Sequence, residues 1–144
     1  MLMGRLMAID YGRKRCGIAV TDSLRIVATG LTTVATGELV SFVSEYAGRE
    51  PIDAIIVGLP RTVNGEESQS MAYIRPGIGQ LRKALPQSPV EFFDERFTSV
   101  IAHRAMLESG MKKMQRRDKA AVDEMAATII LNDYLQSKQY QGLP

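Results

Sequence analysis

An unbroken apolar run over residues 54–59 constrains the fold of this chain more than any other feature of its sequence. A strand that is apolar at every position is expected to be buried on both faces, as in a parallel sheet that helices cover on each side. Pro60 ends the run, as a residue without a backbone N–H should. The run therefore predicts an α/β fold with a sheet between two helical layers.

Weaker patterns around this run predict the rest of the fold. Further strands are expected at 6–10, 16–20, 26–34 and 90–93, and helices at 39–46, 66–84, 98–110 and 118–135. The last helix should bury one apolar stripe, which consists of Val122, Met125, Ala126, Ile129 and Ile130. Three strands in a meander, followed by alternating helices and strands, imply one mixed sheet with the first strand at its centre.

Length and composition favour one cytoplasmic domain. The 144 residues are 45% hydrophobic, which is enough to bury a core, so we expect a single domain over 1–144 with an ordered core at about 5–135 and a short C-terminal tail. No apolar stretch reaches the roughly 20 residues of a membrane span, and Arg5 and Asp10 come too early for a signal-peptide core. Cys16 is the only cysteine, which excludes an internal disulfide.

Asp10 is the first candidate functional residue. It ends the first strand and is followed by the basic turn Arg13-Lys14-Arg15, with Gly12 to allow a tight reversal. A carboxylate beside three cations suits a metal ion held against a phosphate chain. An acid before a turn is more often only a turn-former, so other residues must support the assignment.

Two further carboxylates could join Asp10. Glu95 follows the strand at 90–93, which we expect to lie beside the first strand, and Asp123 lies in the first turns of the last helix. Three carboxylates at one point repel unless a cation joins them, and oxygen ligands without His or Cys favour Mg²⁺ or Mn²⁺. The simpler alternative is ion pairing, of Glu95 with Arg96 and of Asp123 with Lys119.

Positive charge is concentrated in one segment. Residues 96–119 contain seven cations and two acids, a net charge of +5, which leaves −3 for the rest of a chain whose total is +2. Such a segment suits a polyanionic partner, although a solvated helix face has the same composition. The candidate nucleic-acid-binding residues are Arg13, Lys14, Arg15, Arg61, Arg96, Lys112, Lys113, Arg116, Arg117 and Lys119.

Four motifs in order resemble those of the YqgF (RuvX) family. They are Ala8 to Asp22, Val57-Gly58-Leu59-Pro60 with Asn64-Gly65-Glu66, Asp94 to Ser99, and Lys119 to Leu135. The resemblance implies a ribonuclease H-like fold of the RuvC type, with a mixed five-stranded sheet flanked by helices on both faces. By motif position it implies Asp10, Glu95 and Asp123 as the metal-binding catalytic acids.

The same resemblance implies a metal-dependent nuclease that matures the 5′ end of precursor 16S ribosomal RNA, with ribosomal particles as a further partner. Two alternatives stay open: a Holliday-junction resolvase acting on branched DNA, and a nucleic-acid-binding module without activity. Retention of all three acids argues against the binding module, because negative charge beside phosphates weakens binding. An actin-like ATPase is excluded by size, since it closes two domains over its nucleotide.

Overall fold

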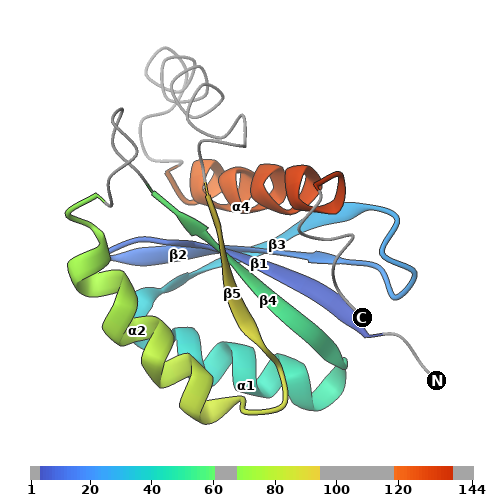
Figure 1. Cartoon of the computed structure of the whole chain (residues 1–144), viewed down its shortest axis with the longest axis horizontal. Helices are drawn as coiled ribbons and strands as arrows, with labels where there is room; N and C mark the ends of the chain where they lie inside the picture. The colour runs from blue at the N-terminus through green and yellow to red at the C-terminus, as the bar shows by residue number, and fades with distance from the viewer. Residues whose placement is uncertain (1–3, 61–67, 95–118, 138–144) are drawn as a thin grey trace.

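The structure, a computed structural model, describes residues 4–60, 68–94 and 119–137. Its five strands are β1 (Arg5–Tyr11), β2 (Arg15–Thr21), β3 (Ala28–Ala35), β4 (Ile52–Leu59) and β5 (Val90–Asp94). They form one sheet in the order β3-β2-β1-β4-β5 (Figure 1). β2 pairs antiparallel with β1 and β3, whereas β4 pairs parallel with β1 and β5. The predicted mixed sheet with the first strand at its centre is confirmed.

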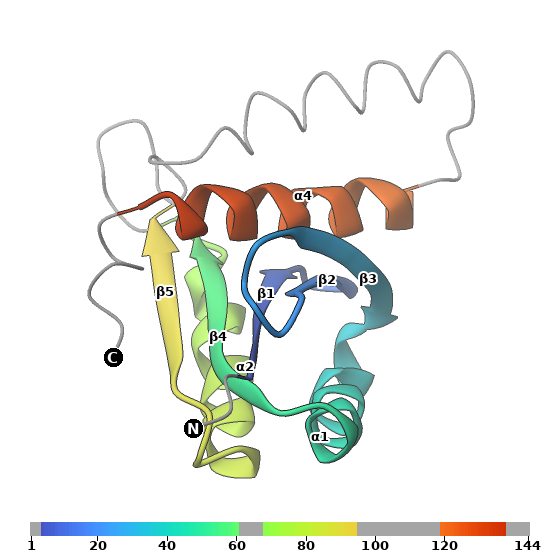
Figure 2. The same cartoon turned by 90° about the vertical axis from the view of Figure 1, so that its right-hand side faces the viewer.

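Helices cover both faces of this sheet. The 3-10 turn η1 (Thr36–Glu38) leads into α1 (Leu39–Arg49), and α1 lies with α2 (Met71–Ala84) on one face. α4 (Lys119–Leu135) lies across the other face, as Figure 2 shows. None of the helices in the described parts of the chain is long and apolar enough to span a membrane.

Strand alternation divides the core into two halves. In β1, Met7 and Ile9 pack in the cluster that α1 and α2 cover, whereas Leu6 and Ala8 pack in the cluster that α4 covers. The predicted run in β4 divides in the same way, and it is buried throughout. Each side chain in a buried strand therefore contributes to one of two cores.

α2 begins later than the sequence predicted. Residues 68–70 form a turn, in which the Ser68 hydroxyl accepts a hydrogen bond from the backbone N–H of Ser70, and the helix starts at Met71. The expected start at residue 66 was therefore wrong, because a serine side chain offers the backbone a competing turn. Pro76 lies within α2 on its exposed side. The helix expected at 98–110 lies outside the described residues.

The stripe predicted for α4 is partly wrong. Val122, Ala126 and Ile130 are buried and Ile129 is partly buried, but the side chain of Met125 is 46% exposed. Buried positions also include Ala127, Leu131 and Tyr134, so the covered face is rotated away from Met125.

β3 also starts later than expected, at Ala28, because Asp22 organises a turn ahead of it. The Asp22 carboxylate accepts hydrogen bonds from the backbone N–H groups of Leu24, Ile26 and Val27. These bonds, the one from Val27 first, lower the pKa of Asp22. Ile26 and Val27 are consequently exposed turn residues.

Candidate metal and nucleic-acid site

Asp10 lies at the carboxyl end of the central strand and on the face that α4 covers. Leu6 and Ala8 of β1 pack under α4, and Asp10 continues this alternating set. Its partner across the antiparallel ladder is Gly17 of β2. Cross-strand partners project to the same face, so the side of the sheet at Gly17 is also the side of Asp10.

Gly17 is the point at which α4 meets this end of the sheet. A Cβ on Gly17 would lie 1.9 Å from the carbonyl oxygen of Asp123 and 2.7 Å from the backbone nitrogen of Glu124. Only glycine allows the backbone of α4 to approach so closely. Because Gly17 pairs with Asp10, this contact brings Asp123 to the same end of the sheet as Asp10.

The thiol of Cys16 responds to both carboxylates. Burial is the main cause that raises the pKa of Cys16, and the charges of Asp10 and Asp123 raise it further. Hydrogen bonds involving Thr36 and the Gly12 backbone oppose this effect. Asp10 and Asp123, which are more than a hundred residues apart in the sequence, therefore both affect the pKa of Cys16.

Asp123 forms an ion pair with Arg15. The Arg15 Nε lies 2.6 Å from the Asp123 Oδ2, and the Asp123 side chain is only 14% exposed. Arg15 begins β2 and belongs to the same alternating set as Gly17, so it reaches α4 directly. The sequence suggested pairing with Lys119 instead, whose side chain lies outside the described residues.

The expectation that the strands of Asp10 and Glu95 are neighbours was wrong. β4 lies between β1 and β5, and Asp94 at the end of β5 pairs with Leu59 of β4. Burial of both faces shows that helices cover a strand on each side, but it does not show which strands lie beside it, so the sequence pattern did not reveal this order. Glu95 itself lies outside the described residues; in sequence it comes two residues after Phe93, which packs on the α4 side.

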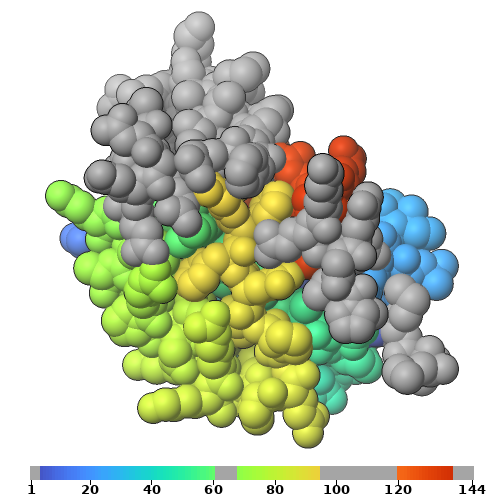
Figure 3. Space-filling model, in the orientation of Figure 1, coloured from blue at the N-terminus to red at the C-terminus, as the bar shows by residue number. Residues whose placement is uncertain are grey.

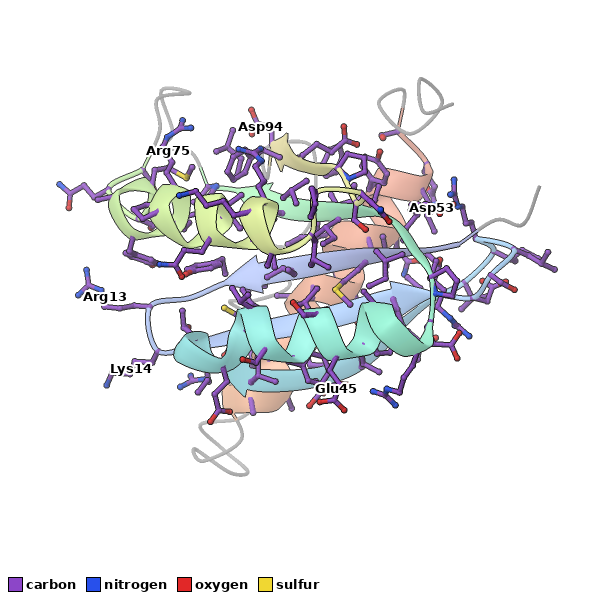
Figure 4. The ribbon with its side chains drawn as sticks, turned by 90° about the horizontal axis from the view of Figure 1, so that it is seen from below. Arg13, Lys14, Glu45, Asp53, Arg75 and Asp94 are labelled. Atoms are coloured by element: carbon purple, nitrogen blue, oxygen red, sulfur yellow. The ribbon has the colours of Figure 1, made fainter. Side chains whose placement is uncertain are left out.

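Few of the predicted cations can be placed. Arg13 and Lys14 are exposed in the turn between β1 and β2, and Figure 4 shows both projecting from one end of the sheet, with Asp53 at the opposite end. Lys119 begins α4, although its side chain is not described. Arg61, Arg96, Lys112, Lys113, Arg116 and Arg117 lie outside the described residues.

The sequence interpretation missed Tyr11, Tyr73 and Gly77, which lie at the same end of the sheet as Asp10 but on the side that α1 and α2 cover. The rings of Tyr11 and Tyr73 lie 6.2 Å apart, and the guanidinium carbon of Arg13 lies 5.2 Å from the centre of the Tyr73 ring. Gly77 makes room for Tyr11, because a Cβ there would lie 1.8 Å from the Tyr11 hydroxyl oxygen. Tyr73 and Gly77 are one helical turn apart in α2, and nothing in that spacing pointed to Tyr11 in the sequence.

The chemistry of the described acids fits a hard divalent cation. Asp10 and Asp123 offer carboxylate oxygens on the α4 side, whereas Cys16 belongs to the opposite core. Mg²⁺ and Mn²⁺ prefer oxygen ligands of this kind. Within residues 4–60, 68–94 and 119–137, no three His, Cys, Asp or Glu side chains are grouped to hold a metal ion. The third predicted acid, Glu95, lies outside these ranges.

Comparison with known proteins identifies relatives over nearly the whole chain. Residues 4–137 match the family model described as RuvX: Holliday junction resolvase. A relative from Phocaeicola vulgatus is 57% identical over 138 residues, covering 96% of this chain and 99% of its own length. One from Flavobacterium johnsoniae is 44% identical over 138 residues, covering 96% of this chain and all of its own. Both carry the name "Putative pre-16S rRNA nuclease".

Among solved structures, RuvC of Thermus thermophilus in complex with a Holliday junction superposes with a TM-score of 0.58 at 17% identity. The match covers 92% of this chain and 95% of that one. A likeness at this identity defines the class by fold: a ribonuclease H-like α/β protein of the RuvC type. Within that class, the chain belongs to the RuvX (YqgF) family.

Proposed function

We propose that this protein is a divalent-metal-dependent nuclease that hydrolyses phosphodiester bonds of structured RNA, and that its reaction is 5′-end maturation of precursor 16S ribosomal RNA. The observation that carries the proposal is that Asp10 and the backbone of Asp123 both adjoin Gly17, at one end of the sheet. The names of the relatives point to the same substrate. We propose further that the whole chain acts as one domain. A protein with this substrate would work in the cytoplasm.

The proposed metal ligands are Asp10, Asp123 and Glu95, with Mg²⁺ or Mn²⁺ as the ion. When bound, such an ion supplies an activated water and stabilises the leaving oxygen of a phosphodiester. Arg15 pairs with the carboxylate of Asp123 on the α4 side of β2, the face to which Asp10 of β1 also projects. This ion pair fixes the position of the acid and offsets part of the repulsion between the two carboxylates.

The cations would bind the nucleic-acid backbone. Arg13 and Lys14 are exposed in the turn that follows Asp10, so a phosphate chain that reaches the acids passes beside them. The net charge of +5 between residues 96 and 119 would extend this attraction along the substrate. Ribosomal particles are the proposed setting for this substrate.

Branched DNA is the second candidate substrate. The family model is described as a Holliday junction resolvase, and the RuvC structure of similar fold holds such a junction. Metal and phosphate chemistry is common to both nucleic acids. Depletion of the protein in cells, followed by mapping of ribosomal RNA 5′ ends, separates the two: unprocessed precursor supports the RNA substrate, and normal ends with recombination defects support the DNA substrate.

The chemistry is tested with Asp10→Asn. Purified wild-type protein with Mn²⁺ should cleave a transcript of the 16S 5′ leader, and the variant should cleave it at least about a hundredfold more slowly, since losing a metal ligand removes several kcal/mol of transition-state stabilisation. RNA binding should be retained. Glu45→Gln is the matched control, because Glu45 is an exposed carboxylate on α1 (Figure 4). Cleavage by Asp10→Asn at the wild-type rate would refute the mechanism.

A further inference from the structure

Three side chains cluster at the end of the sheet where Asp10 lies, on the face that α1 and α2 cover, and we name this cluster the Arg13 shelf. Tyr11 ends β1, Tyr73 lies in α2, and Arg13 lies in the turn after β1. The Tyr11 and Tyr73 rings are 6.2 Å apart with planes 31° from each other, and the guanidinium of Arg13 lies 5.2 Å from the Tyr73 ring centre. Tyr11 and Tyr73 are partly buried and Arg13 is exposed, so Arg13 forms the outer end of the cluster.

The inner part of the shelf is fixed by packing. Tyr11 packs against the core under α1 and α2, and its hydroxyl occupies the space that a side chain at Gly77 would need. Burial is the main cause that raises the pKa of Tyr11, with Cys16 and Tyr73 adding to it. Tyr73 is also packed against that core. Arg13 therefore lies against a pair of aromatic rings that β1 and α2 hold in place.

The outer part of the shelf is available to a ligand. Arg13 is exposed, and among the residues that the structure describes no carboxylate forms an ion pair with it. Arg15, two residues later, is already paired with Asp123. The two arginines of one hairpin therefore do different work: Arg15 holds an acid, and Arg13 presents a planar cation three residues beyond Asp10.

We propose that the Arg13 shelf stacks against the base of an unpaired nucleotide next to the scissile phosphate. The inference rests on the proposed nuclease function and specifies its substrate as single-stranded RNA at that position. Guanidinium planes and aromatic rings stack on exposed bases in single strands, whereas the faces of bases within a duplex are covered by their neighbours. Contact between the guanidinium and Tyr73 reduces the freedom that Arg13 loses on binding.

Stacking and charge are separable at this position. Arg13→Lys keeps the positive charge and removes the planar group, and Tyr73→Leu removes the ring beneath it. Lys14→Gln removes one charge from the same turn and leaves the shelf intact. A matched control lies at the far end of α1, where the guanidinium of Arg49 lies 5.7 Å from the Tyr46 ring centre. Arg49→Lys makes the same chemical change away from the site.

Binding is measured by fluorescence anisotropy in the Asp10→Asn background, with a labelled oligouridylate and a blunt RNA duplex of equal length, over a series of salt concentrations. Arg13→Lys and Tyr73→Leu should weaken oligouridylate binding by about 5- to 150-fold, which corresponds to the loss of one stacked base. Their salt dependence should match that of the parent. Lys14→Gln should instead flatten the slope by about 0.7 per lost contact on a single strand.

Duplex binding should be unchanged by Arg13→Lys, and Arg49→Lys should leave both affinities unchanged. If the Arg13→Lys variant binds the oligouridylate as tightly as the parent, the proposal that the Arg13 shelf stacks against a base is refuted. Equal losses on strand and duplex would also overturn it, since Arg13 would then contact only the backbone. The binding measurements do not depend on cleavage. If Asp10-dependent cleavage is absent, the nuclease function alone is refuted, and the binding series still tests whether the Arg13 shelf stacks on a base.

Discussion

At the scale of single residues, the ion pair between Arg15 and Asp123 joins positions that are 108 residues apart in the chain. Because Arg15 is about one-third exposed, water and salt screen the pair. A double-mutant cycle of Arg15→Gln and Asp123→Asn should therefore give a coupling energy of about 0.5–1 kcal/mol, measured by urea unfolding. If the effects of the two single substitutions on the free energy of unfolding are strictly additive, the ion pair contributes no coupling energy, because water replaces it at no cost.

The sequence predicted Asp10 better than Asp123. The end of the first apolar strand and the basic turn after it singled out Asp10, and both are features of the local sequence. Asp123 could pair with Lys119 on its own helix or with any cation that the fold brings near, and only the register of β2 under α4 selects Arg15. Tyr73 gave no local signal of function, since a half-buried tyrosine in an amphipathic helix is ordinary.

At the scale of elements, α2 contains two glycines with opposite roles, and they form a natural matched pair. A Cβ at Gly79 meets nothing within 4 Å, whereas a Cβ at Gly77 would overlap the Tyr11 hydroxyl. Gly79→Ala should stabilise the protein by roughly 0.5–1 kcal/mol, the ordinary gain of alanine in a helix. Gly77→Ala should destabilise it by about 1–3 kcal/mol, because Tyr11 must move. Chemical denaturation of both variants tests this, and a gain from Gly77→Ala would contradict the packing.

The elements themselves were largely predictable, and their errors have physical causes. The continuous apolar run predicted β4 and its burial on both faces, because a strand that is apolar at every position must be covered on each side. The start of α2 was misplaced by a local serine turn, and Met125 was assigned to the wrong side of α4. Strand order past the centre depends on crossover connections, and so β4 was not foreseen between β1 and β5.

α2 and β5 share further contacts of arginine with an aromatic ring. The two elements adjoin on one side of the molecule in Figure 3. The guanidinium groups of Arg75 and Arg82 of α2 lie 5.9 Å and 5.8 Å from the centre of the Phe92 ring of β5. The Arg13 shelf differs from these contacts in its position at the end of the sheet where Asp10 lies.

At the scale of the whole molecule, metal binding should appear as added stability. Divalent ions that bind the folded site and not the unfolded chain should stabilise the wild type by about 2.7 kcal/mol at 100 times the dissociation constant, or several degrees in melting temperature. Asp10→Asn should lose most of this gain, and Glu45→Gln should keep it. A Mn²⁺ titration followed by thermal unfolding measures both. Equal shifts in all three proteins would mean that the ion binds elsewhere.

The position of α4 at the end of the chain has a consequence for synthesis. A nascent chain of 118 residues already contains every described strand together with α1 and α2, but the helix that packs on Leu6, Ala8 and Phe93 has not been made. Domains fold as their segments emerge from the ribosome. The segment that closes this half of the core also carries Asp123. Completion of the core and assembly of the acid pair are therefore a single event, and a truncated product that lacks α4 has neither.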